Sequence, residues 1–289
     1  MGYLTQPEFL AQLDSLSILA KRVLGGTLRA DRKSDKKGTG INFADYAEYN
    51  PGDDFRAIDW NLYGKLEILF VKLFELEEDT SISLFIDLST SMGTKELYAK
   101  KLAASLAYIA LQNMDRLSIY GIADKLEVIQ RPSHGKGKVF TMLKQLEEAN
   151  LYGKDTDIAS CVKEFQMHNP KKGVCVFISD FFSPSGIEKG MDLLKFYKHD
   201  LFCIHLVDPE ETKCDWKGDI RLECIETKKI NTVTIGPKEA KQYENAVQDW
   251  FDNLKRNCQK KEIGYLRTSI EIPFEEVIQK ILRSGGLVA

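Results

Sequence analysis

Residues 81–91, Ser-Ile-Ser-Leu-Phe-Ile-Asp-Leu-Ser-Thr-Ser, form an apolar run that ends in an aspartate followed by hydroxyl side chains. A short continuous apolar run bounded by polar residues is typical of a β-strand buried on both faces. Similar runs occur at residues 173–180 and 200–208, and they are separated by segments with helical spacing of apolar residues, such as 95–114 and 186–198. Apolar strands between amphipathic helices predict a parallel sheet covered by helices on both faces.

The whole pattern predicts an α/β fold: a doubly wound, mostly parallel sheet flanked by helices, with an N-terminal extension. We expect the core domain at residues 80–289, with a more polar insert near residues 209–236 that forms a hairpin. Residues 1–79 are expected to supply a helix over residues 7–24 that two glycines terminate, a charged surface loop, and a segment that packs on the core.

The composition is that of an ordinary globular protein: 43% of the 289 residues are hydrophobic, 29% are charged, and the formal net charge is −3. This balance gives no general attraction to nucleic acid. Seven Lys or Arg residues fall between positions 21 and 37, but aspartates interrupt them and no aromatic residue lies among them, so we expect a solvated loop there. No apolar run is long enough to cross a bilayer and no signal-peptide pattern is present, so we expect a cytoplasmic protein without a membrane span.

The six cysteines do not form a C-x-x-C pair, which argues against a zinc or thioredoxin-like site. Cys175 and Cys203 lie in apolar strands, where cysteine serves as a small core residue. Cys214 and Cys224 could meet across the predicted hairpin, but reduced thiols are favoured in a protein without a secretory signal. The four histidines show no metal-binding spacing, and neither a G-x-S-x-G elbow nor a Walker A loop occurs.

Oxygen-bearing side chains follow the predicted strands at one edge of the sheet. In a parallel sheet, ligands bind beyond the carboxyl ends of the strands, so these side chains are expected to converge there. Hydroxyls and carboxylates are ligands for a hard divalent cation, so we predict a site for one Mg²⁺ or Mn²⁺ ion. The predicted metal-site residues are Asp87, Ser89, Ser91, Thr156 and Asp180. The alternative is that they are turn and capping residues in a fold without a metal.

The order of these residues resembles the metal-ion-dependent adhesion site (MIDAS) of von Willebrand factor A domains. Asp87, Ser89 and Ser91 match its D-x-S-x-S element, and Thr156 and Asp180 match the later threonine and aspartate. The three hydroxyls can bind the ion directly, while the two aspartates hold bound waters and balance charge. With so few carboxylates bound directly, the ion can accept a carboxylate from a partner protein.

The segment Tyr46-x-x-Tyr49-x-Pro51-Gly52-Asp53-Asp54-x-Arg56-x-Ile58-Asp59-Trp60 resembles the signature of the domain-of-unknown-function 58 (DUF58) family. This resemblance implies a bacterial protein with a von Willebrand factor A-like domain that is associated with a MoxR-type AAA+ ATPase. Many members of that family carry N-terminal transmembrane helices, which this sequence does not show. The resemblance therefore does not imply that this protein is anchored in a membrane.

The carboxylates of this signature segment have two interpretations. Asp53, Asp54 and Asp59 could serve acid/base catalysis or a second metal site. They could instead form an ion-paired corner with Arg56 that packs and buries Trp60 and Tyr49 against the main domain, and we favour this structural interpretation because no nucleophile or histidine accompanies them. The Pro-Gly pair is suited to the centre of a type II turn.

Two functions therefore remain open. The first is a metal-dependent protein–protein interaction module, an adaptor or co-factor for a MoxR-type AAA+ ATPase in protein maturation or complex assembly, whose partner supplies an acidic residue. The second is a metal-dependent hydrolase that uses the same cation to activate water. A hydrolase would need a positioned general base and a substrate pocket near Ser89. The sequence shows no base beyond the metal-site aspartates, so a binding module rather than an enzyme is expected.

Overall fold

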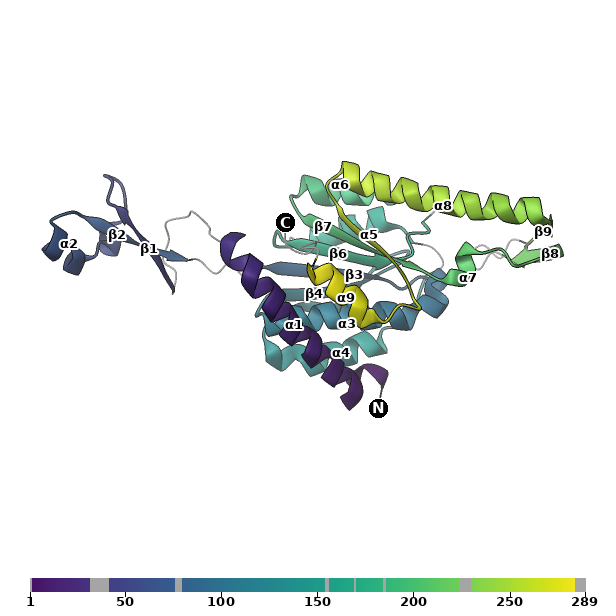
Figure 1. The fold of residues 1–289 in the computed structure, drawn as a ribbon, viewed down its shortest axis with the longest axis horizontal. Helices are drawn as coiled ribbons and strands as arrows, with labels where there is room; N and C mark the ends of the chain where they lie inside the picture. Colours follow the sequence, from purple (N-terminus) through teal and green to yellow (C-terminus); the bar gives the residue numbers. More distant parts are fainter. Residues whose placement is uncertain are drawn as a thin grey trace. The chain divides into compact units, whose positions relative to one another are not determined.

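The computed structural model describes most of the chain, and its elements are labelled in Figure 1. The described residues are 2–31, 42–75, 80–153, 156–168, 170–183, 186–223 and 230–283. The chain divides into two compact units, the first made of residues 1–23 and 80–289 and the second of residues 24–79.

A six-stranded sheet forms the centre of the first unit, with the strand order β10-β7-β6-β3-β4-β5. Five strands are parallel, and the edge strand β5 runs antiparallel to β4. The strands are β3 (Ser81–Asp87), β4 (Arg116–Ile122), β5 (Leu126–Ser133), β6 (Val174–Ser179), β7 (Asp200–Val207) and β10 (Gly264–Ser269). The predicted doubly wound, mostly parallel α/β sheet is confirmed.

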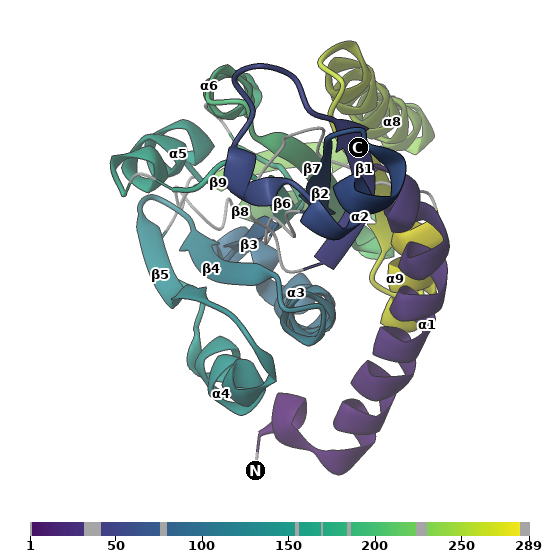
Figure 2. The same ribbon diagram turned by 90° about the vertical axis from the view of Figure 1, so that its left-hand side faces the viewer.

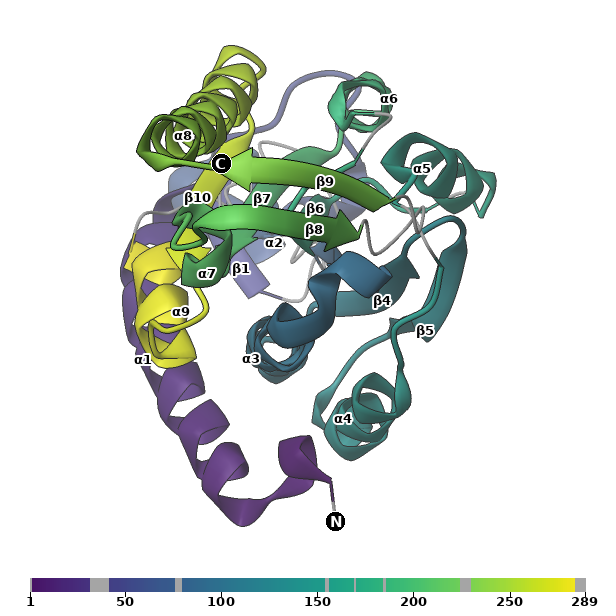
Figure 3. The ribbon, with the colours of Figure 1, turned by 90° about the vertical axis from the view of Figure 1, so that its right-hand side faces the viewer.

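Helices cover both faces of this sheet, as Figures 2 and 3 show. One face carries α3 (Glu96–Gln112), α4 (Val139–Glu148), α9 (Phe274–Arg283) and the part of α1 (Pro7–Asp31) that belongs to the first unit. The other face carries α5 (Ile158–Met167), α6 (Glu188–Phe196) and α8 (Pro237–Lys260). Both faces of the inner strands β3, β4, β6 and β7 are therefore buried, which explains their continuous apolar sequences.

Aromatic rings fill the core between the sheet and α5. The Phe85 ring lies 4.5 Å from the ring of Phe177 and 5.3 Å from that of Tyr120, both in stacked geometry. Phe165 of α5 meets Phe85 edge-on at 5.0 Å. These side chains are almost fully buried, so the middle of β3 is held tightly and its carboxyl end is fixed in place.

The first helix is longer than the sequence predicted. α1 continues through Gly25 and Gly26 to Asp31, so the prediction that the glycines end it is wrong. Each glycine costs a helix only about 1 kcal/mol relative to alanine, which need not interrupt a long helix. The N-terminal part of α1 packs in the first unit, where the rings of Phe9 and Phe274 lie 5.6 Å apart and Tyr108 donates a hydrogen bond to Asp14.

The second unit contains a two-stranded antiparallel sheet of β1 (Asn42–Glu48) and β2 (Phe70–Glu75). Between them lie the short 3-10 helix η2 (Phe55–Ala57) and helix α2 (Trp60–Leu66). The predicted Pro-Gly turn is present, since the backbone N–H of Asp53 donates to Asn50 at 2.9 Å and Gly52 has a φ of 114°.

The polar insert forms the predicted hairpin. It contains α7 (Pro209–Thr212) and the antiparallel strands β8 (Gly218–Glu223) and β9 (Ile230–Ile235). Cys224 lies outside the described residues. The five described cysteines carry free thiols.

Two surface properties of the described residues complete the fold. None of their helices combines the length and hydropathy that a membrane crossing requires.

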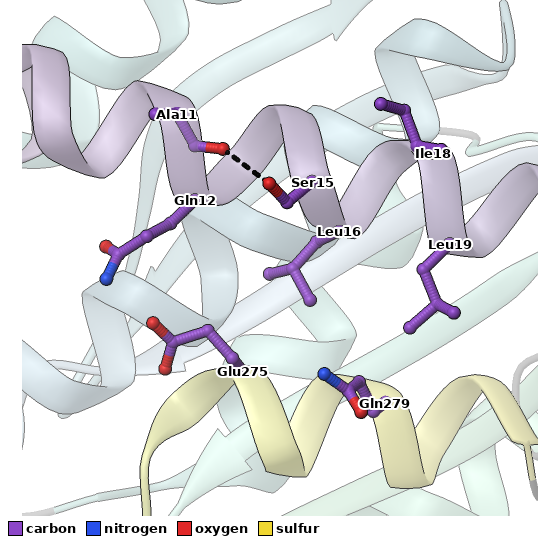
Figure 4. Close-up of a pocket in the computed structure, with 8 residues that line it drawn as sticks. All are labelled: Ala11, Gln12, Ser15, Leu16, Ile18, Leu19, Glu275 and Gln279. Atoms are coloured by element: carbon purple, nitrogen blue, oxygen red, sulfur yellow. Dashed lines mark hydrogen bonds between the residues drawn. The ribbon is translucent and has the colours of Figure 1, made fainter.

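A groove of about 510 Å³ lies between α1 and α9, and Figure 4 shows the side chains that line it. Its lining residues come mainly from α1 and include no metal-site residue.

Candidate functional site

The carboxyl ends of neighbouring strands bring the predicted site residues to one edge of the sheet. Asp87 is the last residue of β3, and Asp180 directly follows the end of the adjacent parallel strand β6. Both side chains are 1% exposed. The prediction that these two aspartates open at the same edge is confirmed.

The Asp87 carboxylate organises the hydroxyl residues around it. Its Oδ1 accepts a hydrogen bond from the backbone N–H of Ser89 at 3.0 Å and one from Thr156 Oγ1 at 3.3 Å. The hydroxyl oxygens of Ser89 and Ser91 lie 2.9 Å apart. Four of the five predicted residues therefore belong to one hydrogen-bonded group.

The fifth residue, Asp180, acts on this group through its charge. Burial and the nearby Asp180 carboxylate raise the pKa of Asp87 to about 6. Asp180 Oδ1 accepts a hydrogen bond from the backbone N–H of Phe182 at 3.1 Å, whereas its buried Oδ2 forms an ion pair.

A buried lysine faces this oxygen. Lys95 ends the short 3-10 helix η3 (Thr90–Lys95), and its Nζ lies 2.7 Å from Asp180 Oδ2. Both side chains are 1% exposed. The Lys95 ammonium also pairs with Glu211. Burial opposes the charge of Lys95, but the two carboxylates outweigh this effect and raise its pKa above the usual value, so the lysine is positively charged.

Two loop connections hold the site in position. The backbone N–H of Leu88 donates to Ile122 at 2.9 Å, and that of Tyr152 donates to Leu88 at 2.7 Å. Asp157, next to Thr156, caps the N-terminus of α5 by accepting a hydrogen bond from the backbone of Ser160. Asp157 is therefore a capping residue, and Asp155 lies outside the described residues.

The residues after Asp180 adopt an unusual conformation. Phe181 has a φ of 58°, in the left-handed region that a bulky side chain rarely occupies, and it is 3% exposed. The Phe182 ring, 39% exposed, stacks on Trp250 of α8 at 4.5 Å. The buried Phe181 side chain thus fixes Asp180, while Phe182 forms an aromatic rim beside it.

Three residues of this edge were missed by the sequence reasoning. Ser179 donates its hydroxyl to Asp87 Oδ2 and accepts a hydrogen bond from the backbone N–H of Phe181. Asp208 follows the adjacent strand β7 and accepts hydrogen bonds from Thr94 Oγ1 at 2.6 Å and from the backbone of Glu210. Its position after an apolar strand, like that of the other two aspartates, could have identified it. Nothing in the sequence around Lys95 showed that this lysine is buried.

The donor set suits a divalent cation that keeps several waters. It consists of two buried carboxylates and three hydroxyls, and the Lys95 ammonium lies 2.7 Å from one oxygen of Asp180. A cluster of three or more His, Cys, Asp or Glu side chains, the pattern of an all-protein metal cage, does not occur among the described residues. The site therefore fits Mg²⁺ or Mn²⁺ with mainly neutral protein ligands.

The carboxylates of the signature segment have structural roles. Asp54 pairs with Arg56 at 2.9 Å. Asp59 lies 3.1 Å from Lys72 Nζ, accepts a hydrogen bond from Tyr46 at 3.0 Å, and caps α2. The contact with Lys72, followed by the other two, lowers its pKa to about 2. The prediction that Trp60 is buried is wrong, because its side chain is 62% exposed. The segment is held by capping and ion pairs rather than by burial of its tryptophan.

Comparison with known proteins gives relatives of similar length. The uncharacterized proteins Rv1480 of Mycobacterium tuberculosis and Mb1516 of Mycobacterium bovis are each 25% identical to this chain over 248 residues, covering 82% of it and 77% of the relative. The crystal structure of BatB from Bacteroides thetaiotaomicron aligns with a TM-score of 0.45 and 12% identity, covering 71% of this chain and 98% of that one. An aerotolerance-related membrane protein from Bacteroides fragilis aligns with a TM-score of 0.44 and 12% identity, covering 71% and 97%.

A family profile covers most of the first unit and the signature segment. The family described as "Protein of unknown function DUF58" matches residues 45–250, more than half of the chain. The match includes all five predicted metal-site residues and the signature from Tyr46 to Trp60. The chain belongs to the DUF58 family.

Proposed function

We propose that this protein is a divalent-cation-dependent protein-binding module, of the von Willebrand factor A type, rather than an enzyme. The observation that carries the proposal is the gathering of the Ser89, Ser91 and Thr156 oxygens at the edge that holds the Asp87 and Asp180 carboxylates. Burying two carboxylates at neighbouring strand ends is unfavourable, and the Lys95 ammonium compensates Asp180 alone of the two among the described ion pairs. Turn and capping roles alone do not account for this pair of buried carboxylates.

The residues of this site would have two roles, as direct metal ligands and as partners of metal-bound water. Ser89, Ser91 and Thr156 would hold Mg²⁺ or Mn²⁺ directly, and Asp87 and Asp180 would hold its waters and balance its charge. A bound ion would supply a positive charge that is only partly offset and can accept a carboxylate oxygen from a partner. Ser91 is only half-buried, so it lies on the side from which a partner could approach.

The surface beside the site is suited to a protein partner. Phe182 is partly exposed, stacks on Trp250, and lies two residues from Asp180. Exposed aromatic side chains next to a charged contact are common at the centres of protein interfaces. We therefore infer that a partner places an acidic side chain at the metal and an apolar side chain against Phe182.

Membership of the DUF58 family suggests the class of partner. We propose a cytoplasmic MoxR-type AAA+ ATPase or its client, and a role in protein maturation or complex assembly. In this interpretation the chain is an adaptor, and the metal links its binding to an acidic residue of the partner.

Metal binding is tested by calorimetric titration of the purified protein with Mg²⁺ and Mn²⁺. We expect one site per chain and a rise in melting temperature with occupancy. Asp87→Ala should abolish both effects, whereas Asp215→Ala, which removes an exposed aspartate from the polar insert, should leave them unchanged. Equal titrations for the wild type and Asp87→Ala would contradict the assignment of the site.

Recognition is tested by affinity capture from native lysate in Mg²⁺ and in chelator, followed by direct binding to a purified MoxR-type ATPase. We expect binding to need the metal and to fall at least tenfold in Ser89→Ala and Phe182→Ala. Identical capture in both conditions would mean that the metal has no part in recognition.

A further inference from the structure

Lys95 places a positively charged side chain at the predicted metal site. Its ammonium lies 2.7 Å from Asp180 Oδ2, at a position where both side chains are 1% exposed. A fully buried ammonium is very unfavourable unless carboxylates neutralise it, so this ion pair is a structural requirement of the described state. The Asp180 carboxylate therefore has a resident partner that a divalent ion would have to share or displace.

The surroundings give Lys95 an alternative partner. Glu211 of α7 also pairs with the ammonium, and its side chain is 34% exposed. Glu211 further accepts a hydrogen bond from the backbone N–H of Asp208, which completes the capping box of α7. If Asp180 is engaged by a metal ion, Lys95 can keep its charge balanced through Glu211.

We propose that Lys95 is the resident counter-cation of this site, that it competes with the divalent ion for Asp180, and that it thereby sets the affinity of the site. This inference rests on the proposed function. Removing the ammonium should free Asp180 and remove a repulsion between two cations, which strengthens metal binding. Without the Glu211 carboxylate, Lys95 should pair more firmly with Asp180, and metal binding should weaken.

The experiment measures the Kd for Mn²⁺ by calorimetry in the wild type and in two variants. Lys95→Met should bind Mn²⁺ at least tenfold more tightly, and Glu211→Gln should bind it several-fold more weakly. The matched control is Lys100→Met, because Lys100 is also a buried lysine in an ion pair, with Glu96 at 2.7 Å, but has no contact with the site. A general effect of losing a buried lysine would move the control as well.

Each result decides between outcomes. Tight binding by Lys95→Met, with or without binding by the wild type, supports the competition. Equal Kd values for the wild type and Lys95→Met would overturn it while leaving the proposed metal site intact. Failure of every variant to bind Mn²⁺ would overturn both proposals. If Lys95→Met does not fold, Glu211→Gln still decides, because an unchanged or tighter Kd contradicts the competition.

An independent observation concerns the opposite end of the sheet. A cavity of about 360 Å³ opens at the amino ends of β3 and β4, far along these strands from Asp87. Its basic lining residues are Arg116, Arg131, His168 and Lys171. None of its described lining residues is acidic, and none of the three Arg and Lys side chains forms an ion pair with a described residue.

The floor of this cavity supplies hydrogen-bond donors. Ser81, Ser83 and Ser118 are buried, and the hydroxyls of Ser83 and Ser118 lie 3.0 Å apart. Guanidinium groups that pair with no described carboxylate and line the same cavity as buried hydroxyls are a favourable setting for a doubly charged oxyanion, because arginine binds phosphate oxygens in a bidentate manner. The volume is in the range of sites for small molecules.

We infer that this cavity binds a small phosphate-bearing molecule. The probes are inorganic phosphate, inorganic pyrophosphate and citrate, titrated calorimetrically at low salt. Pyrophosphate should bind with a Kd below a millimolar, and Arg116→Gln should weaken it at least tenfold. Arg221→Gln, which removes an exposed arginine of β8, is the control and should change nothing. Tighter binding of citrate would assign a polycarboxylate instead, and equal binding by the wild type and Arg116→Gln would overturn the site.

Discussion

Ser179 donates its hydroxyl hydrogen bond to Oδ2 of Asp87, from the end of the neighbouring strand. The same hydroxyl accepts the backbone N–H of Phe181 at 2.7 Å. Ser179 thus joins the two strand ends and orients a carboxylate that the proposed metal site needs. It is a positioning residue, because it acts through Asp87.

Ser179→Ala should therefore change both stability and metal binding. The buried Asp87 Oδ2 would lose a donor, which costs about 1–3 kcal/mol of unfolding free energy. The Kd for Mn²⁺ should rise about tenfold, because outer partners of metal ligands contribute 10- to 100-fold. Ser83→Ala is the matched control: it removes a buried hydroxyl of the same sheet, bonded to Ser118 at 3.0 Å, and should lower stability only. An unchanged Kd in Ser179→Ala would show that Asp87 does not depend on this bond.

The second unit should be sensitive to Asp59 and tolerant at Trp60. Because Trp60 is 62% exposed, Trp60→Ala should change the unfolding free energy by no more than about 0.5 kcal/mol. Asp59→Ala removes the cap of α2 and the partner of Lys72 and Tyr46. It should therefore destabilise the second unit and speed the exchange of its backbone amides. Amide hydrogen exchange of residues 42–75 measures this. Slow exchange in Asp59→Ala and fast exchange in Trp60→Ala would show that Trp60, and not Asp59, stabilises this unit.

His205 should make stability depend on pH. Burial, followed by the charges of Arg267 and Lys95, lowers its pKa to about 3, while Nδ1 is hydrogen-bonded to Tyr265. The unfolded chain binds this proton near pH 6.5 and the folded chain does not, so stability falls as the pH drops from about 6.5 toward 3.

Chemical unfolding at two pH values checks the His205 effect. Between pH 7 and pH 5 the wild type should lose about 1–2 kcal/mol more than His205→Asn, which lacks the titrating ring. Measuring the difference between the two proteins cancels the opposite effect of Asp87, whose raised pKa favours the folded state at low pH. Parallel pH profiles would mean that His205 is protonated in the folded protein.

A glycine before β6 should be irreplaceable. A Cβ on Gly173 would lie 2.0 Å from the backbone oxygen of Ser81, so the adjoining strand would have to move. Gly173→Ala should cost at least about 1–3 kcal/mol, as overpacking in a core does. Gly137→Ala is the control, because nothing lies within 4 Å of its position. Thermal unfolding compares the two, and equal melting temperatures would show that β3 and β6 can separate without cost.

The sequence predicted the central sheet well because its inner strands β3, β4, β6 and β7 are buried on both faces. Such strands read as unbroken apolar runs, and the residues that follow them identify the functional edge, as Asp87 and Asp180 show. The strand β1 was not predicted, because Asn42–Glu48 mixes charged and apolar residues in a two-stranded sheet with little burial. Trp60 was wrongly predicted to be buried, because the identity of an aromatic residue does not show whether neighbouring residues cover it.

The candidate site was predicted only where its residues form a sequence motif. Lys95 was missed because a lysine before a helix usually points into solvent, and only the three-dimensional arrangement brings Asp180 and Glu211 to its ammonium. Ser179 was missed because a serine at the end of an apolar strand is also a common core residue. Such roles depend on contacts between distant segments, which spacing along the chain does not encode.

The antiparallel edge strand β5 bears on how this protein avoids aggregation. A sheet edge offers unpaired backbone groups to other chains, and natural proteins protect such edges with charges, proline and irregular pairing. β5 carries exposed Glu127, Arg131 and Pro132, and its register with β4 shifts around Ile119. Proline cannot donate a backbone hydrogen bond, so another strand could not extend the sheet continuously from this side. The last strand of the sheet therefore resists the growth of intermolecular β-structure during folding and at high concentration.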